Sequence, residues 1–581
     1  MAPERVTTVI EPSYRPRELR PTRWDVIAAL VVFGLLVTLA SEFGELAKPL
    51  GPSGPTPITL DPAELPYYAF RTVSRMFLAL GVSLLFTFGY ATLAAKSRRA
   101  ERLMVPVLDI LQSVPILGYV SVAVTALAAA FPNRQLGYEL SAIFALFTSQ
   151  AWNMTFSLFQ SLKTVPEELT EAARSFQLTA WQRFWRLEVP FAVPGLVWNA
   201  MMSMSGGWFF IVAAEAISVA GHDVNLPGIG SYIALATAES SLRGVFYAVL
   251  AMLFVIVVYD VVIFRPLVAW SERYKAELSP DLKVAQSWVL NVVRRARLMR
   301  AAAGMLGRGL EALTAGLRVV HRARELQRAP SRLAQIVGRV WEPLWIIAAV
   351  LGFLAIARFV HSSVDWSEIR TAFGLGLLTG VRVFALVLIA AAIWAPIGVW
   401  VGLRPRVMQI VQPVAQFLAA FPANLLFPIF ASLVTDYRLN PDIWLSPLIV
   451  LGTQWYILFN VIAGAAAFPA DLKQAAQSLR LKGFLWWWRV MLPGIFPYLI
   501  TGIITAAGGA WNATVVAEVV SWGQTRVVAS GLGSYIANAT NQGDFARIAL
   551  GVAVMALYVT VLNRILWRPL YAMAERRYHI T

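Results

Sequence analysis

Long apolar runs recur along this chain, and they restrict its fold more than any other feature of the sequence. The stretches WDVIAALVVFGLLVTLA (24–40) and WIIAAVLGFLAIARFV (345–360) carry almost no charge. About 20 consecutive apolar residues suffice for a helix to cross the core of a bilayer. Only 14% of the residues are charged, whereas about a quarter is usual in a soluble domain. The sequence therefore predicts an all-α membrane protein.

The apolar runs predict about twelve transmembrane helices in two groups of six. The first group comprises 24–41, 72–95, 104–131, 139–162, 192–218 and 245–265, and the second comprises 342–360, 372–402, 407–434, 444–466, 494–520 and 547–567. No cleavage-site pattern follows the first run, so 24–41 is interpreted as a retained span. We expect four parts: a cytoplasmic segment 1–23, a six-span domain 24–275, a basic cytoplasmic linker 276–340 with amphipathic helices, and a second six-span domain 341–581.

The placement of basic residues predicts the orientation. Residues 272–340 hold 14 Lys and Arg against 5 Asp and Glu, and KSRRAER (96–102), RPR (404–406) and AERRYHIT (574–581) fall on the same side. Cytoplasmic loops carry an excess of Lys and Arg, so both termini and the linker should be cytoplasmic. Much of the net charge of +16 is then explained by membrane orientation, which disfavours nucleic-acid binding.

No residue pattern in the chain predicts a metal site. Cysteine is absent, which excludes disulfides and thiolate ligands. The four histidines are scattered without ligand spacing.

An internal repeat relates the two groups of spans. Residues 166–195 and 469–498 align without a gap at an offset of 303 (469 minus 166), and GIGSYIA (228–234) recurs as GLGSYIA (531–537). Upstream, Arg75 and Arg382 match at an offset of 307 (382 minus 75). Each copy holds six spans, so both have the same orientation, and the repeat is parallel about an axis along the membrane normal. The functional site should lie between the halves. The linker is interpreted as a tether between two fused subunits, with a regulatory domain as the alternative.

A charged loop separates the fourth and fifth spans of each half. It reads VPEELTEAARSFQLTAWQRFWRLEVP at 165–190 and FPADLKQAAQSLRLKGFLWWWRVMLP at 468–493. Thr164 followed by Glu167 has the form of a capping box, which predicts the start of a short helix. A turn and a second helix, which runs into the next span, should follow. Matching positions in both halves suit docking to a symmetric cytoplasmic partner. The alternative is a loop helix that packs on its own domain.

Both loops resemble the EAA loop of permease subunits in binding-protein-dependent ABC importers. Glu171-Ala172-Ala173 fits the motif in the first copy and Gln474-Ala475-Ala476 in the second, while Gln177 and Arg480 stand where the family has glycine. The next spans, GGWFFIVAAEAIS (206–218) and GGAWNATVVAEVVS (508–521), resemble the nitrate/sulfonate/taurine-type branch. The resemblance implies two fused six-helix permease domains of the type I importer fold. It assigns coupling to an ATPase to Glu168, Glu171, Ala172, Ala173, Gln177, Asp471, Gln474, Ala475, Ala476 and Arg480.

The resemblance also implies partners and a substrate class. The chain has no G-x-x-x-x-G-K-[ST] motif, which is needed to hold nucleotide phosphates. We therefore expect a transport subunit that is not an enzyme and binds no cofactor itself, with ATP and Mg²⁺ on two separate ATP-binding cassette subunits. An extracytoplasmic substrate-binding protein and a place in the bacterial inner membrane are implied as well. The branch transports small anions and related solutes such as nitrate, sulfonates, taurine and bicarbonate.

Polar and aromatic residues in the spans are candidates for a translocation pathway. They are Asn153, Asn199, Ser203, Trp208, Glu215, Gln454, Asn512, Trp511 and Glu518. Glu215 and Glu518 either pair across the repeat axis or accept hydrogen bonds from the GxGSY loops, and the polar side chains could instead join helices within a half. Arg75 and Arg382 could attract anions or snorkel. Helices near the pathway could be broken at three segments, Val114-Pro115, Phe421-Pro422 and LPGIG (226–230). The alternative function is a twelve-span secondary transporter, which would not need the paired loops.

Overall fold

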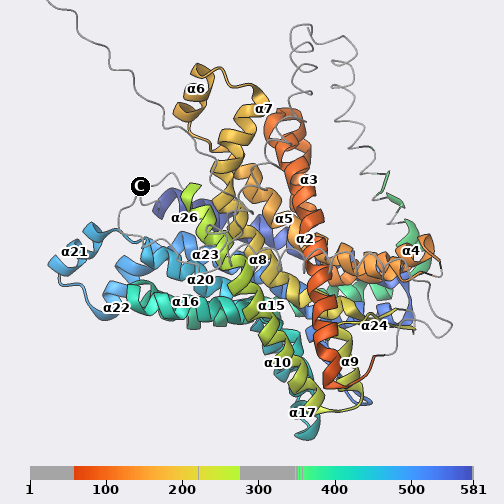
Figure 1. The fold of residues 1–581 in the computed structure, drawn as a ribbon. Coiled ribbons are helices and arrows are strands. Elements are labelled where there is room, and N and C mark those ends of the chain that lie inside the picture. The colour runs from red at the N-terminus through yellow and green to blue at the C-terminus, as the bar shows by residue number, and fades with distance from the viewer. Residues whose placement is uncertain are drawn as a thin grey trace, which may run out of the picture.

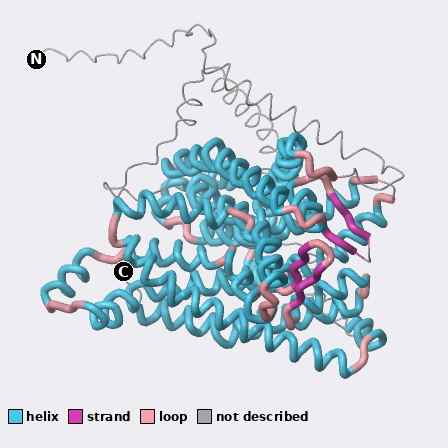
Figure 2. The backbone as a smooth tube through the Cα atoms, turned by 90° about the horizontal axis from the view of Figure 1, so that it is seen from below, coloured by secondary structure: helices cyan, strands magenta, loops and turns pink. Residues whose placement is uncertain are grey.

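The computed structural model describes residues 58–274 and 358–578, apart from 133, 220 and 221, and a few positions between 347 and 355. The predicted N-terminal segment, the span 24–41, the linker 276–340 and much of the span 342–360 lie outside the described residues. The described part is helical except for loops and two short β-hairpins, which were not predicted from the sequence (Figures 1 and 2).

Among the described residues, the first half contains ten α-helices and one hairpin, which follow a 3₁₀ turn, η1 (Pro62–Glu64). They are α2 (Leu65–Lys96), α3 (Arg98–Ser113), α4 (Ile116–Ala130), α5 (Leu136–Lys163), α6 (Glu167–Ser175), α7 (Ala180–Arg183), α8 (Val189–Glu215), β1 (Ala216–Val219), β2 (His222–Asn225), α9 (Ile229–Ala238), α10 (Leu242–Tyr259) and α11 (Arg265–Ser271). Two π-helical segments, η2 (Phe184–Glu188) and η3 (Asp260–Phe264), connect α7 to α8 and α10 to α11, and a 3₁₀ turn, η4 (Glu272–Tyr274), follows α11.

The second half repeats this order except at two helices, α4 and α5. It contains α15 (Trp366–Gly402), α16 (Pro405–Ala420), η5 (Ala423–Leu426), α17 (Phe427–Asp436), α18 (Pro441–Trp444), α19 (Ser446–Leu451), α20 (Gln454–Ala466), α21 (Ala470–Ser478), α22 (Gly483–Trp486), η6 (Trp487–Met491), α23 (Leu492–Ala517), β3 (Val519–Trp522), β4 (Thr525–Val528), α24 (Leu532–Gln542), α25 (Phe545–Leu562), η7 (Asn563–Trp567) and α26 (Arg568–Tyr578). Here η5 and α17 stand where the first half has α4, and α18, α19 and α20 stand where it has α5. The bounds of α6 and α21, and of η2 and η6, differ by the offset of 303 read from the sequence (470 minus 167, 487 minus 184).

Proline explains why the π-helical segments recur. Pro190, Pro266, Pro493 and Pro569 each lie two residues beyond such a segment. Proline donates no backbone hydrogen bond, and its ring clashes with the carbonyl four residues earlier. That carbonyl lies within the π-helical segment in every case, and the wider turn relieves the clash.

The described residues contain fewer continuous spans than the twelve predicted for the whole chain. Six helical stretches are long and apolar enough to cross a membrane, namely 62–96, 180–215, 242–271, 366–402, 483–517 and 545–574. Two further pairs pass the same test together but are bent, by 73° between 405–420 and 423–436 and by 44° between 441–451 and 454–466. Counting each bent pair as one span gives eight among the described residues. The predicted spans 104–131 and 407–434 are both broken, at Pro115 and at Pro422, where helices α4 and η5 begin anew.

The two halves are joined at one end and diverge at the other. Helix α4 contacts α23, α24 and α25 of the other half, and α8 contacts α16 and η5. Each half also buries residues in the apolar core of the other. Leu117 and Val120 of the first half lie in the core of the second, and Ala420 and Leu425 of the second lie in the core of the first. Figure 1 shows α6 and α21 at two separate tips, while α9, α17 and α24 gather at the opposite end.

Candidate translocation and coupling sites

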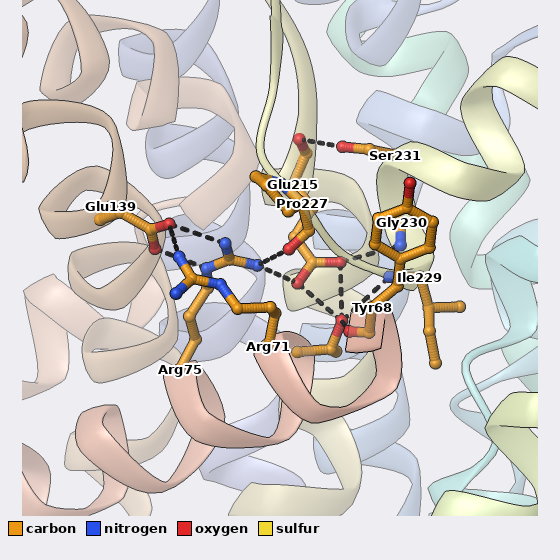
Figure 3. Close-up of polar contacts among 10 residues, drawn as sticks. Tyr68, Arg71, Arg75, Glu139, Glu215, Pro227, Ile229, Gly230 and Ser231 are labelled. Carbon is orange, nitrogen blue, oxygen red and sulfur yellow. Dashed lines mark hydrogen bonds and ion pairs between the residues drawn. The ribbon is translucent and has the colours of Figure 1, made fainter. Parts of the chain in front are cut away.

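Arg75 is the centre of a buried ion-pair cluster in the first half (Figure 3). From α2, its guanidinium donates to Glu139 of α5 (Nη2 to Oε1, 2.7 Å) and to Glu215 of α8 (Nη1 to Oε1, 2.7 Å). Arg71, one turn earlier, also donates to Glu139 (2.7 Å). The four charged side chains are at most 2% exposed. Two cations balance two carboxylates, so the cluster joins three helices and its arginines are not free to attract an anion.

The carboxylate of Glu215 also holds the GxGSY loop. Gly230 N donates to Oε2 at 2.8 Å, and Thr72 Oγ1 donates to Oε1 at 2.8 Å. The same hydroxyl accepts from Ile229 N at 3.0 Å. A side chain at Gly228 would overlap the Glu215 carboxylate, so the loop's first glycine permits this close approach.

The second half contains a smaller version of this cluster. Arg382 donates to Glu518 (3.0 Å) and to Asp442 (3.2 Å), and Thr379 Oγ1 donates to Glu518 and accepts from Leu532 N. Leu378 occupies the position of Arg71. The Asp442 side chain is 44% exposed. Here one cation faces two carboxylates, and one of these is partly in solvent.

Glu215 and Glu518 are thus each hydrogen-bonded within their own half. This agrees with the predicted alternative in which they accept hydrogen bonds from the GxGSY loops. Arg71, Thr72 and Glu139 of the first cluster were not among the predicted site residues. The repeat held the signal for two of them, because Glu139 matches Asp442 at the offset of 303 and Thr72 matches Thr379 at the offset of 307.

The remaining pathway candidates are dispersed among several environments. Asn199 donates to its own helix at Gly195 O, and Gln454 accepts from Trp394 Nε1. Ser203, Trp208 and Trp511 are buried. Asn153 is exposed on α5. Among the described residues, no hydrogen bond joins one of these side chains to another, and their place on a pathway stays a prediction.

Asn512 differs, because its hydrogen bond crosses between the halves. Its Oδ1 accepts from Ile116 N at 2.7 Å, at the start of the helix that follows the Pro115 break. A second hydrogen bond crosses between the halves near the Pro422 break, where Asn424 Nδ2 of the second half donates to Phe209 O of the first at 3.1 Å. Phe209 is the repeat match of Asn512. The predicted helix breaks at Pro115 and Pro422 therefore lie at the interface of the halves.

Helices α6 and α21 are the predicted docking helices. Along α6, Glu168, Glu171 and Ala172 are exposed, and along α21 so are Asp471, Gln474 and Ala475. In contrast, Ala173 and Ala476 are buried, with exposed fractions of 5% and 4%. Each helix thus has one alanine inward and one outward.

Both docking helices also expose large apolar side chains at matching positions. Leu169 and Phe176 are 39% and 79% exposed, and Leu472 and Leu479 are 43% and 72% exposed. Because this exposure recurs at matching positions in both halves, it favours a contact surface over chance exposure of single side chains.

The residues in place of the family's glycine adopt the backbone that favours glycine. Gln177 and Arg480 both have φ of 52°. After α6, Leu178 N donates to Ala173 O (3.0 Å) and Gln177 N to Arg174 O (2.8 Å), and the same pair of bonds follows α21. These are the two bonds of a Schellman motif, which requires a left-handed residue at this position. The helix therefore ends as it would with glycine.

The predicted capping box at Thr164 is wrong. Thr164 ends α5, with its hydroxyl donating to Gln160 O, and Pro166 is the N-cap of α6. The proline ring fixes φ and leaves no side chain to cap. A capping box forms instead at α7, between Thr179 and Gln182.

Comparison with known proteins identifies the family. The model of the family "Binding-protein-dependent transport system inner membrane component" matches residues 86–265 and 394–578, more than half of the chain. The chain belongs to this family. It carries the family's domain twice, with one match within each predicted six-span domain, and it is a transport component rather than an enzyme.

Individual relatives are similar over part of the chain. The nitrate import permease protein NrtB of Leptolyngbya laminosa is 28% identical over 182 residues, covering 31% of this chain and 62% of the relative. The bicarbonate transport system permease protein CmpB of Synechococcus elongatus is 30% identical over 176 residues, covering 30% and 60%. The taurine transport system permease protein TauC of Escherichia coli is 26% identical over 228 residues, covering 39% and 73%. The match thus spans about three fifths of the first two relatives.

Proposed function

We propose that this chain carries two membrane-spanning halves of an ATP-driven importer, with the translocation pathway between them. The observation that carries this proposal is the double family match together with two exposed docking helices at matching positions. Separate ATP-binding cassette subunits would bind α6 and α21 and supply ATP and Mg²⁺. An extracytoplasmic binding protein would deliver substrate to the opposite end.

In this proposal both halves, 24–275 and 341–581, have the type I importer fold, and 276–340 tethers them. The docking helices and both termini are cytoplasmic, which places the hairpins at the outer side of the bacterial inner membrane. The halves diverge at the docking end (Figure 1). We infer that the pathway is closed on the outer side, where Gly523 N of the second hairpin donates to Thr237 O of the first half.

The proposed substrate is a small anion or related solute. Relatives named for nitrate, bicarbonate and taurine support this class. The charged clusters argue against a pathway lined by free arginines, because Arg75 and Arg382 are already paired. Passage would instead follow neutral groups at the interface, with Asn512 and Phe209 at equivalent points.

The secondary-transporter alternative is less well supported. Such a protein would use ionisable groups that take up and release a coupling ion. The buried ionisable groups of the clusters are in ion pairs that join helices within a half.

Alanine-to-arginine substitutions on the docking helices test the proposal. Ala172→Arg with Ala475→Arg alters only the outward faces, so we expect the chain to fold but to lose its co-purifying ATPase. Ala173→Arg with Ala476→Arg is the matched pair on the inward faces, and it should destabilise the chain itself because a charge would be buried. ATPase retention by the outward pair, or uptake that depends on a proton gradient without ATP hydrolysis, would count against the importer.

A further inference from the structure

A buried carboxylate fastens the first docking loop to its neighbouring helices. Glu188 ends the π-helical segment η2, directly before α8. Lys96, the last residue of α2, donates from Nζ to both of its oxygens at 2.6 Å. Arg183 of α7 donates from Nε to Oε1 at 3.1 Å. These three residues are called the Glu188 clamp.

The clamp lies between the docking helix α6 and the membrane-spanning helix α8 along the chain. Helix α6 is followed by α7, η2 and then α8, which runs on to Glu215 and the hairpin. Through Lys96 the clamp also holds the end of α2, which carries Arg75. The Glu188 side chain is only 7% exposed. Lys96 and Arg183 together compensate this carboxylate, and a buried carboxylate without both cations would be strongly unfavourable.

The second half has no charge at any position of the clamp. Leu403, Trp486 and Met491 occupy the positions of Lys96, Arg183 and Glu188. Met491 is fully buried, and Leu403 and Trp486 pack against the same apolar core. The nearby ion pair of Lys163 with Glu101 is likewise replaced, by Ala466 and Met408. The halves therefore fasten equivalent loops by different physical means.

We propose that Glu188, held by Lys96 and Arg183, is a positioning residue that transmits movement of the first docking helix to α2 and α8, while apolar packing around Met491 does so in the second half. This inference rests on the proposed docking of ATPase subunits. Coupling through the first half then depends on charge. Because the Lys96 side chain is 42% exposed, salt should weaken that coupling by screening.

A distance measurement across the docking end tests the clamp without knowledge of the substrate. The chain has no cysteine, so Arg99→Cys and Arg406→Cys can carry spin labels. These exposed positions are equivalent, in the first turns of α3 and α16. Pulsed electron paramagnetic resonance would be recorded on the full chain with its co-purified ATPase subunits, without nucleotide and with Mg-ATP and vanadate.

If the clamp transmits movement, its loss should leave ATPase binding intact and reduce only the nucleotide-dependent change in distance. Nucleotide should shorten the distance in the parent chain. Glu188→Met and Lys96→Leu should keep the ATPase bound but lower the ratio of short to long distances roughly tenfold, equivalent to about 1.4 kcal/mol. Lys96→Arg should restore the parent response, since it keeps the charge. Glu101→Gln is the matched control, because its ion pair is 35% exposed on both sides and exposed pairs contribute little.

The outcomes separate the clamp from the proposed function. A parent chain that binds no ATPase or shows no shortening would overturn the proposed function and this inference with it. Normal shortening in the Glu188 and Lys96 variants would overturn the clamp alone. If Glu188→Met does not fold, Glu188→Gln decides, because it keeps the size of the side chain and removes only its charge.

Discussion

Gln177 and Arg480 hold a left-handed backbone at which a side chain is unfavourable. A residue other than glycine costs about 1–2 kcal/mol there, partly offset by the greater freedom of glycine in the unfolded chain. We therefore expect Gln177→Gly to stabilise α6 locally by about 0.5–1 kcal/mol. Slower amide hydrogen exchange along α6 would report the gain. Ser175→Gly, two residues earlier in the helix, is the control and should speed exchange; the same slowing in both variants would contradict the explanation.

The two ion-pair clusters should respond unequally to the loss of a carboxylate charge. Glu215→Gln leaves two buried arginines against Glu139 alone, so we expect a loss of about 3–5 kcal/mol. Glu518→Gln leaves Arg382 paired with Asp442 and should cost clearly less. The melting temperatures of the two variants in detergent provide the comparison. Equal effects, or a larger effect of Glu518→Gln, would show that the charge balance of the clusters does not set their stability.

The repeat made most of the individual elements predictable from the sequence. The docking helices, the breaks at Pro115 and Pro422 and the GxGSY loops all lie where the paired motifs indicated. The hairpins were missed because each strand has four residues and adjoins a long apolar helix, so no alternation is visible. The cap at Thr164 was misplaced because a short pattern fits the end of one helix as well as the start of the next. The ion-pair clusters bring together residues far apart in the chain, which periodicity alone does not place.

The connection between β4 and α24 depends on glycine for closeness rather than for backbone angle. Gly531 has φ of 175°, which any residue adopts, but a side chain there would overlap the Glu518 carboxylate. We expect Gly531→Ala to lower the melting temperature markedly. Gly508→Ala in α23 is the control, since an added methyl group meets nothing within 4 Å and alanine favours a helix by about 0.5–1 kcal/mol. An unchanged melting temperature for Gly531→Ala would mean that the loop can shift away from Glu518.

At the scale of the whole molecule, the second hairpin fastens the two halves together at the end remote from the docking helices. Gly523 at its tip donates to Thr237 O of α9 at 2.8 Å, and Trp522 packs against the apolar cores of both halves. If transport requires this end to open, a covalent bond between the halves here must stop the cycle. A β-carbon built at Gly523 would lie 3.7 Å from that of Ser240, within the usual range for a disulfide.

The double variant Ser240→Cys with Gly523→Cys, in this cysteine-free chain, should therefore form a disulfide across the halves on oxidation. We expect ATP hydrolysis by the reconstituted complex to fall sharply when the bond forms and to recover with dithiothreitol, because a closed outer end prevents turnover. The single variants control for strain at these two positions, where φ is positive, and should be insensitive to the oxidant. Undiminished hydrolysis by a fully cross-linked chain would mean that the halves need not separate at the hairpins, and the pathway would then have to open elsewhere along their interface.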